Sequence, residues 1–223
     1  MFTSRLGTQK IPEKRTSYED IWIENHEVKL WHEGKHNEGR ELHNINNLRI
    51  LLHFMNRRCH YNIGVPEGAA AWSRQRLDII KSLGGNGKTP SAWLGKECAL
   101  TFGLGCQLCG CGRNEEGFDK IEEFLSLYEN WAKIPDGELL SFGDELVYGK
   151  VKYPKGAVYF ILEDGRRISD YNVSSWDLGY NISTAIYGMT AEHGWAWFDG
   201  VRNEKRFKEL LERAKELSAK LNK

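Results

Sequence analysis

The spacing of apolar residues along the chain predicts a mixed α and β protein. Four apolar residues recur at intervals of three or four positions, the spacing of one helical face: Ile45, Leu48, Leu52 and Met55. The run LRILL within this stretch could equally form a buried strand. The same periodicity predicts helices at 68–83, 115–133 and 201–221.

Other segments alternate with a period of two, which is typical of strands. The runs LVYGKVKY and GAVYFILEDGRRI predict strands joined by a turn at Pro154-Lys155-Gly156, and residues 21–31 predict a short hairpin. The polar stretch HEGKHNEGRELHN at 32–44 is expected to be a loop. We therefore predict an α+β fold, with helices packed on a small antiparallel sheet that forms a meander in residues 140–190.

Length and composition set the expected organisation. The 223 residues, 40% of them hydrophobic, can bury a core without disulfides. We expect a flexible arm at 1–17, a basic lobe with histidines and cysteines at 18–112, and a lobe at 113–223 with an acidic helix, the meander and the last helix. Residues 18–223 could also form one domain. The sequence has no apolar run of signal-peptide or membrane-helix length, which predicts a cytoplasmic protein that does not bind membranes.

Three of the five cysteines lie within CQLCGCG at 106–112. The Cys106-x-x-Cys109-Gly110 spacing is that of a zinc knuckle, in which a tight turn directs two thiolates at one ion. Cys98 and Cys111 would complete four ligands, and Cys59 and His60 are more distant candidates. We expect a loop stabilised by zinc, with an iron–sulfur cluster or free thiols as the alternatives.

The net charge is zero, but the charges are segregated along the chain. Residues 49–96 contain eight basic and two acidic residues, whereas residues 114–145 contain two basic and ten acidic residues. These segments could neutralise each other. Alternatively, the first could form a basic, aromatic surface for nucleic acid, a nucleotide or an acidic protein. The candidate ligand-binding residues are Arg57, Arg58, Arg74, Arg76, Trp72 and Trp93.

The histidine-rich stretch contains further candidate chemistry. Residues 32–36, HEGKH, match the H-E-x-x-H pattern of zinc proteases, which requires both imidazoles on one helical turn. Region 32–64, with His32, His36, Asn47, Asn56 and His60, resembles the His-Me finger (HNH) nucleases, in which a ββα unit holds a metal ion against the scissile phosphate. Trp31 and Lys35 stand where that family has the partner of its base.

That resemblance implies specific roles. His36 or His32 would be the general base, Asn56 or His60 would lie at the metal, and the ion would be Mg²⁺ or Mn²⁺. Two weaker patterns are GGNGKT at 84–89, which lacks the first glycine of a phosphate-binding loop, and Glu192-His193 beside two tryptophans.

Two classes of function remain after these considerations. The first is a zinc-stabilised binding or regulatory protein for nucleic acid, a nucleotide or an acidic protein partner. The second is a metal-dependent nuclease. The sequence favours the first, because no catalytic set is complete in it.

Overall fold

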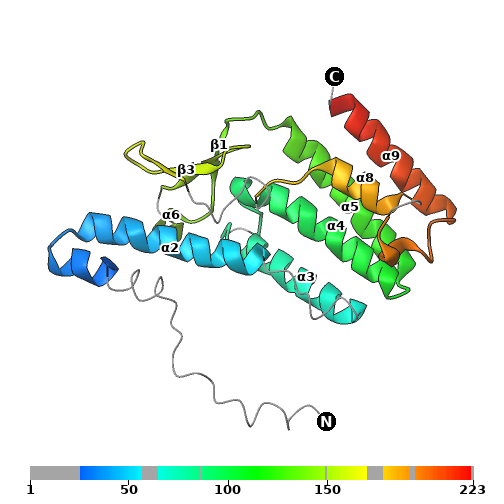
Figure 1. The fold of residues 1–223 in the computed structure, drawn as a ribbon, viewed down its shortest axis with the longest axis horizontal. Coiled ribbons are helices and arrows are strands. Elements are labelled where there is room, and N and C mark those ends of the chain that lie inside the picture. Colours follow the sequence, from blue (N-terminus) through cyan, green and yellow to red (C-terminus); the bar gives the residue numbers. More distant parts are fainter. Residues whose placement is uncertain are drawn as a thin grey trace, which may run out of the picture. The chain divides into compact units, whose positions relative to one another are not determined.

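The computed structural model describes residues 26–56, 65–85, 87–148, 150–169, 178–190 and 194–221, apart from the side chains at 56, 146, 147 and 169. The chain divides into two compact units, Met1–Leu48 and Arg49–Lys223 (Figure 1). The division falls within the long helix α2 (His36–Asn56). The boundary predicted near residue 112 lies inside the second unit.

The described part of the first unit is a pair of helices joined by a tight turn. Residues 26–32 are helical, the chain turns at 33–35, and α2 begins at His36. Gly34 has a φ of 74° in this turn, a conformation that glycine adopts without steric cost. The hairpin predicted at 21–31 is therefore wrong for residues 26–31, and the loop predicted at 32–44 is wrong at His32 and from His36 onward. The predicted apolar stripe of α2 is confirmed, since Leu48 and Leu52 are each 1% exposed.

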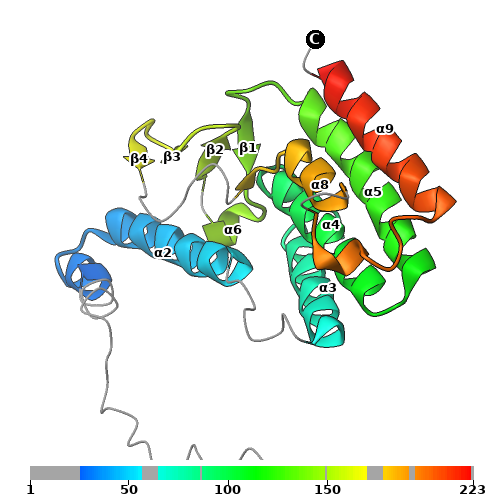
Figure 2. The same ribbon diagram turned by 45° about the vertical axis from the view of Figure 1, so that its right-hand side comes forward.

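The second unit contains most of the described helices. They are α3 (Pro66–Ser82), η2 (Ser91–Trp93), α4 (Leu94–Gly110), α5 (Asn114–Lys133), α6 (Glu145–Tyr148), α8 (Ile182–Met189), η3 (Ala196–Phe198) and α9 (Lys205–Leu221). The helices predicted at 68–83, 115–133 and 201–221 are confirmed as α3, α5 and α9. Figures 1 and 2 show α5 lying between α4 and α9.

Helix α4 is the element that the sequence pattern did not predict. Twelve of its 17 residues are buried, because it packs against both α3 and α5. A helix surrounded in this way is apolar on nearly every side and therefore lacks the one-sided stripe that marks a surface helix. The loop predicted for the cysteine-rich segment is wrong, since Cys98, Cys106 and Cys109 lie within α4 and Cys111 follows its last residue.

Glycines on α4 allow backbone and side-chain atoms of other segments to approach this helix closely. A Cβ atom at Gly105 would lie 3.0 Å from the carbonyl oxygen of Gly117 on α5 and 2.9 Å from Ile121 Cγ1. A Cβ at Gly95 would lie 2.3 Å from the Leu178 carbonyl oxygen, and one at Gly110 would lie 2.4 Å from the Trp197 ring. Each of these positions therefore excludes a side chain.

The sheet is a four-stranded antiparallel meander, as predicted. Its strands, in the order β1-β2-β3-β4, are β1 (Leu139–Ser141), β2 (Lys152–Pro154), β3 (Tyr159–Ile161) and β4 (Arg167–Ser169). The turn predicted at Pro154-Lys155-Gly156 is confirmed, and a second turn follows Asp164; Gly156 and Gly165 in these turns have φ values of 80° and 81°. The meander is shorter than predicted, because residues 145–148 and 182–189 are helical.

Among the described residues, no helix has the length and apolar character needed to cross a membrane.

The close contact of α4 with α5 predicts an asymmetric response to substitution at two glycines of the same helix. Gly105→Ala should lower the free energy of unfolding by about 1–3 kcal/mol, because its Cβ meets backbone that cannot move aside. A Cβ at Gly103 meets nothing within 4 Å. Gly103→Ala should therefore raise the free energy of unfolding by about 0.5–1 kcal/mol. Urea unfolding followed by circular dichroism measures both values, and equal effects would contradict the packing.

Candidate nucleic-acid interface

The alternation of side chains in the meander gives it one core face and one outward face. Leu140, Tyr153 and Phe160 are at most 3% exposed and form the core face with Phe142. The strand registers pair Lys152 with Ile161, and Ile161 with Arg167, across the other face. Successive side chains alternate along a strand, so Tyr159, two positions before Ile161, lies on that outward face as well.

An aromatic ring and a cation stack on this outward face. The guanidinium carbon of Arg167 lies 4.8 Å from the centroid of the Tyr159 ring. Leu139 on the edge strand β1 is 54% exposed, and the side chains of Lys152, Tyr159 and Ile161 are half-buried. We name these five residues the meander face: Leu139, Lys152, Tyr159, Ile161 and Arg167.

The meander is also a basic part of the chain. Residues 150–169 contain five basic and two acidic residues. Lys150 pairs with Glu163 at an exposed position, and the half-buried Lys152 lies 3.5 Å from the exposed Glu145. Ion pairs that are this accessible to solvent contribute little stability. Lys155 is different, because its ammonium lies 4.8 Å from the Trp131 ring and its side chain is only 11% exposed. Because the ion pairs of Lys150 and Lys152 are weak, phosphate groups could replace Glu163 and Glu145 as their partners.

Part of the basic surface predicted at 49–96 is used for packing. Arg76 donates to the Met55 carbonyl oxygen at 2.9 Å, and thus caps the last turn of α2, and its guanidinium lies 5.6 Å from the Trp72 ring. Trp72 in turn packs edge-on against Phe54, with centroids 4.9 Å apart. These side chains hold α2 to α3, which gives Arg76 and Trp72 a structural role, and the ligand-binding role expected of them stays a prediction.

The other residues of that prediction fall in three places. Trp93 is fully buried and donates its indole N–H to the Phe142 carbonyl oxygen, so it cannot stack on a ligand at the surface. Arg74 is half-buried on α3. The pKa of Glu116 is lowered mainly by the hydrogen bond from Arg113, and the charge of Arg74 adds a smaller contribution in the same direction. Arg57 and Arg58 lie outside the described residues.

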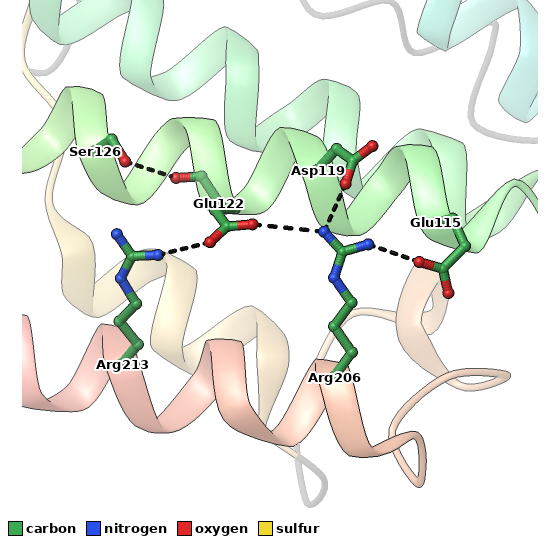
Figure 3. A network of polar contacts seen from close by, with 6 residues as sticks. All are labelled: Glu115, Asp119, Glu122, Ser126, Arg206 and Arg213. Atoms are coloured by element: carbon green, nitrogen blue, oxygen red, sulfur yellow. Dashed lines mark hydrogen bonds and ion pairs between the residues drawn. The ribbon is translucent and has the colours of Figure 1, made fainter.

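Four carboxylates of the acidic helix α5 pair with basic residues of α9, and three of the four are drawn in Figure 3. Arg206 lies 2.6 Å from Glu115, 2.5 Å from Asp119 and 3.5 Å from Glu122. Arg213 pairs with Glu122 and Lys220 with Glu129, at 3.0 and 3.4 Å. The expectation that residues 49–96 would neutralise this acidic segment is therefore wrong for these carboxylates.

The histidines predicted for catalysis lie on two helices. His32 ends the first helix and His36 begins α2, so the turn at Gly34 prevents them from sharing one helical turn, as H-E-x-x-H chemistry requires. The helical structure of 26–32 and 36–56 also differs from the ββα unit that the nuclease resemblance implied. The His36 ring instead packs against Trp31, with centroids 4.6 Å apart. His60 and the side chain of Asn56 lie outside the described residues.

A different histidine has an orienting carboxylate. His43 Nδ1 lies 3.1 Å from Glu27 Oε2, and Asn46 Nδ2 donates to the other oxygen of that carboxylate at 2.5 Å. Since an ionised carboxylate can only accept, the neutral imidazole carries its proton on Nδ1 and has its lone pair on Nε2. The side chain of His43 is 57% exposed and that of Glu27 only 18%.

The four cysteines do not converge in helix α4. Cys98 and Cys106 are eight residues apart, which is about 12 Å along a helix axis, whereas two thiolates on one zinc ion each lie about 2.3 Å from it. Among the described residues, no group of three or more His, Cys, Asp or Glu side chains could hold a metal ion. The zinc site of Cys98, Cys106, Cys109 and Cys111 is therefore not confirmed, and zinc binding elsewhere in the chain stays a prediction.

Burial controls the ionisation of the cysteine and glutamate side chains of α4. Desolvation raises the pKa of Cys98 and of Cys109 to about 12, and raises that of Cys106 as well. Thiols in this state remain protonated at neutral pH and are poor nucleophiles. Glu97 is 5% exposed, and burial raises its pKa, although the nearby Thr89 side chain and the charge of Lys81 oppose the shift.

Sequence reasoning missed the meander face and the His43–Glu27 pair. The spacing of Tyr159 and Ile161 on one predicted strand indicated part of the meander face. The strand register was needed to show that Lys152 and Arg167 lie on the same face. Glu27 and His43 are 16 positions apart, and they meet only because residues 33–35 turn the chain. Comparisons with protein-family models, curated proteins and solved structures return no match, so the chemistry of these residues is the basis for assigning a function.

The thiols of α4 should be protected in the native protein. Iodoacetamide should modify Cys111, which is half-buried, before Cys98, Cys106 or Cys109, which are buried and protonated. Peptide mass spectrometry of native and urea-unfolded samples measures the order. Native labelling of Cys106 at the rate of Cys111, or one zinc released in step with these thiols, would contradict the inert arrangement.

Glu97 should make stability fall as the pH rises. Because its pKa is raised in the folded state, the folded protein holds this proton more tightly than the unfolded chain. The contribution is complete below the unfolded pKa and is lost as the pH rises through the folded one. Glu97→Gln should therefore be more stable than wild type at pH 8, and this difference should shrink at pH 4. Urea unfolding at both pH values tests this, and a difference independent of pH would contradict it.

Proposed function

We propose that the protein binds single-stranded nucleic acid through the meander face. The observation that carries this proposal is the Arg167 guanidinium over the Tyr159 ring, 4.8 Å from its centroid, in a strip of chain with five basic and two acidic residues. A ring of this kind can stack on an unpaired base, and the arginine can contact the adjoining phosphate.

The chemistry favours a single strand over a duplex. The bases of a duplex are already stacked on each other, so a side chain in a small sheet reaches their faces only when they are unpaired. Ile161 and Leu139 add apolar surface beside Tyr159, while Lys152 adds a cation in the same row as Arg167. This combination also distinguishes nucleic acid from an acidic protein partner, which would need the cations but not the ring.

The proposal relocates the basic, aromatic surface expected from the sequence. The residues first considered for it, Arg76 and Trp72, pack α3 against α2. The carboxylates of α5 are paired with α9 or, for Glu116 and Glu123, with Arg113 and Lys120, and so they do not compete for the cations of the meander. A binding role without catalysis by the meander face is consistent with its composition, which contains no histidine or cysteine.

Substitutions on the meander face should weaken binding to a single-stranded 20-nucleotide RNA. Tyr159→Leu keeps apolar volume but removes the π-face, and should lower affinity about tenfold, as expected for one stacked base. Arg167→Ala should also reduce the dependence of log K on log salt by about 0.7, the value for one phosphate contact with a single strand. Fluorescence anisotropy at salt concentrations from about 50 to about 200 mM measures both effects, because affinity that depends on phosphate contacts falls over roughly this range.

The matched control is Lys215→Ala on α9. Lys215 is 46% exposed and pairs with Glu212 within its own helix, so its loss removes the same charge at a position away from the sheet. Its affinity and salt dependence should equal those of wild type. RNA binding that is absent in the wild type, or that falls equally with Lys215→Ala and Arg167→Ala, would disprove a specific meander face.

A further inference from the structure

The pair formed by His43 and Glu27 has the arrangement that a general base requires. We infer that His43 cleaves single-stranded RNA by activating the ribose 2′-hydroxyl, without a metal ion. The inference rests on the proposed function for its substrate class. It assigns a reaction to the first unit, where the sequence had pointed to His32 and His36.

The support for His43 is buried while its imidazole is accessible. Asn46 is 4% exposed and fixes one carboxylate oxygen of Glu27, and the other oxygen accepts from His43 Nδ1. A carboxylate that is fixed by a second hydrogen bond sets the tautomer and orientation of the imidazole. It also stabilises the imidazolium cation that forms when Nε2 takes a proton. The 57% exposure of the His43 side chain gives an RNA strand access to that nitrogen.

Neighbouring side chains fit the other needs of the reaction. Trp31 is 53% exposed and packs at the first turns of α2, against the His36 ring and the backbone of Gly39. Its exposed indole can stack on a base. Arg40 lies three residues before His43 on the same helix, which places the two as surface neighbours, and its guanidinium can contact the phosphate.

The reaction conserves atoms and charge without a co-reactant. His43 Nε2 takes the proton of the 2′-hydroxyl, and the 2′-oxygen forms a bond to phosphorus. The bond from phosphorus to the 5′-oxygen breaks, and that oxygen takes a proton from solvent. The products are a 2′,3′-cyclic phosphate and a 5′-hydroxyl, and His43 returns its proton to water. General-base catalysis of this kind contributes about 10²–10⁴-fold to a rate.

A flexible polymer substrate makes the two proposed surfaces compatible. RNA held by one part of a chain presents its other nucleotides at a high local concentration, so binding and cleavage do not need to share one pocket. Variants of each surface should therefore affect different measurements. Meander-face variants should change affinity, and His43 variants should change the rate at saturating RNA.

The test incubates the full chain with a labelled single-stranded RNA in EDTA and, in parallel, with the same strand carrying one ribose among deoxyriboses. Wild type should cut the RNA, cut the mixed strand only after the ribose, and leave a cyclic phosphate end. His43→Ala should lower the rate about 100-fold or more with unchanged RNA affinity, and added imidazole should restore part of it. His43→Asn, whose amide can still donate to Glu27, is a second variant that keeps the support intact.

His53→Ala is the matched control, since His53 is an exposed histidine on the same helix. It should retain the wild-type rate. Glu27→Gln should lower kcat with little change in KM, because it alters the orientation of the base and not the contact with RNA. Cleavage that survives in His43→Ala, that requires Mg²⁺, or that is absent while RNA binding persists would overturn the role of His43 and leave the meander face standing. Loss of RNA binding by the wild type would overturn the proposed function instead.

Discussion

The close approach of α4 and α5 is the constraint on which the second unit depends. A Cβ at Gly117 would lie 2.5 Å from Cys109 Sγ and 2.9 Å from the carbonyl oxygen of Gly105, so each helix needs a glycine where the other passes. This contact fixes which side of α5 is buried. Phe118 and Ile121 then face inward at 0% exposure, and the charged side of α5 is left for α9. The arrangement of charges in the scaffold thus follows from a steric requirement between two backbones.

That arrangement explains how a chain with segregated charges remains balanced. The acids of α5 meet Arg206 and Arg213 of α9, which lie more than 80 residues later in the sequence. Each surface ion pair of this kind contributes little to the free energy of unfolding. Because Arg206 is shared by three carboxylates, however, their negative charges are balanced at the contact between α5 and α9. The apolar contact of Phe207 with Phe198, 5.0 Å between centroids, holds α9 in register beneath these pairs. The cations of the meander are consequently not consumed by the acidic helix.

The sequence predicted the elements that have one solvent-exposed side and one buried side. Helices α3, α5 and α9 and the meander all alternate between core and solvent, and their periodicity was therefore readable. Helix α4 was missed because it is buried on nearly every side and because Cys106, Cys109 and Gly110 are typical of a metal-binding turn. The start of α2 was missed because His36 to His43 is polar and contains Gly39, whose contact with the Trp31 ring no pattern predicts. The candidate sites were harder still, because register and a chain reversal bring their residues together.

The cysteine cluster has a physical explanation that does not require a ligand. Where α4 runs against α5, side chains must be small, and cysteine behaves as a small hydrophobic residue when it is buried. Cys109 rests over Gly117, and Cys106 is 2% exposed, one helical turn before it. A Cys-x-x-Cys spacing places both residues on one helical face, so the same interval that suits a zinc knuckle also suits two packing positions. Spacing alone cannot separate these cases, whereas the helical conformation of residues 94–110 and the burial of twelve of these 17 residues favour packing. Packing between α4 and α5 thus accounts for Cys106 and Cys109 without a ligand, whereas His43 and the meander face are accessible to one.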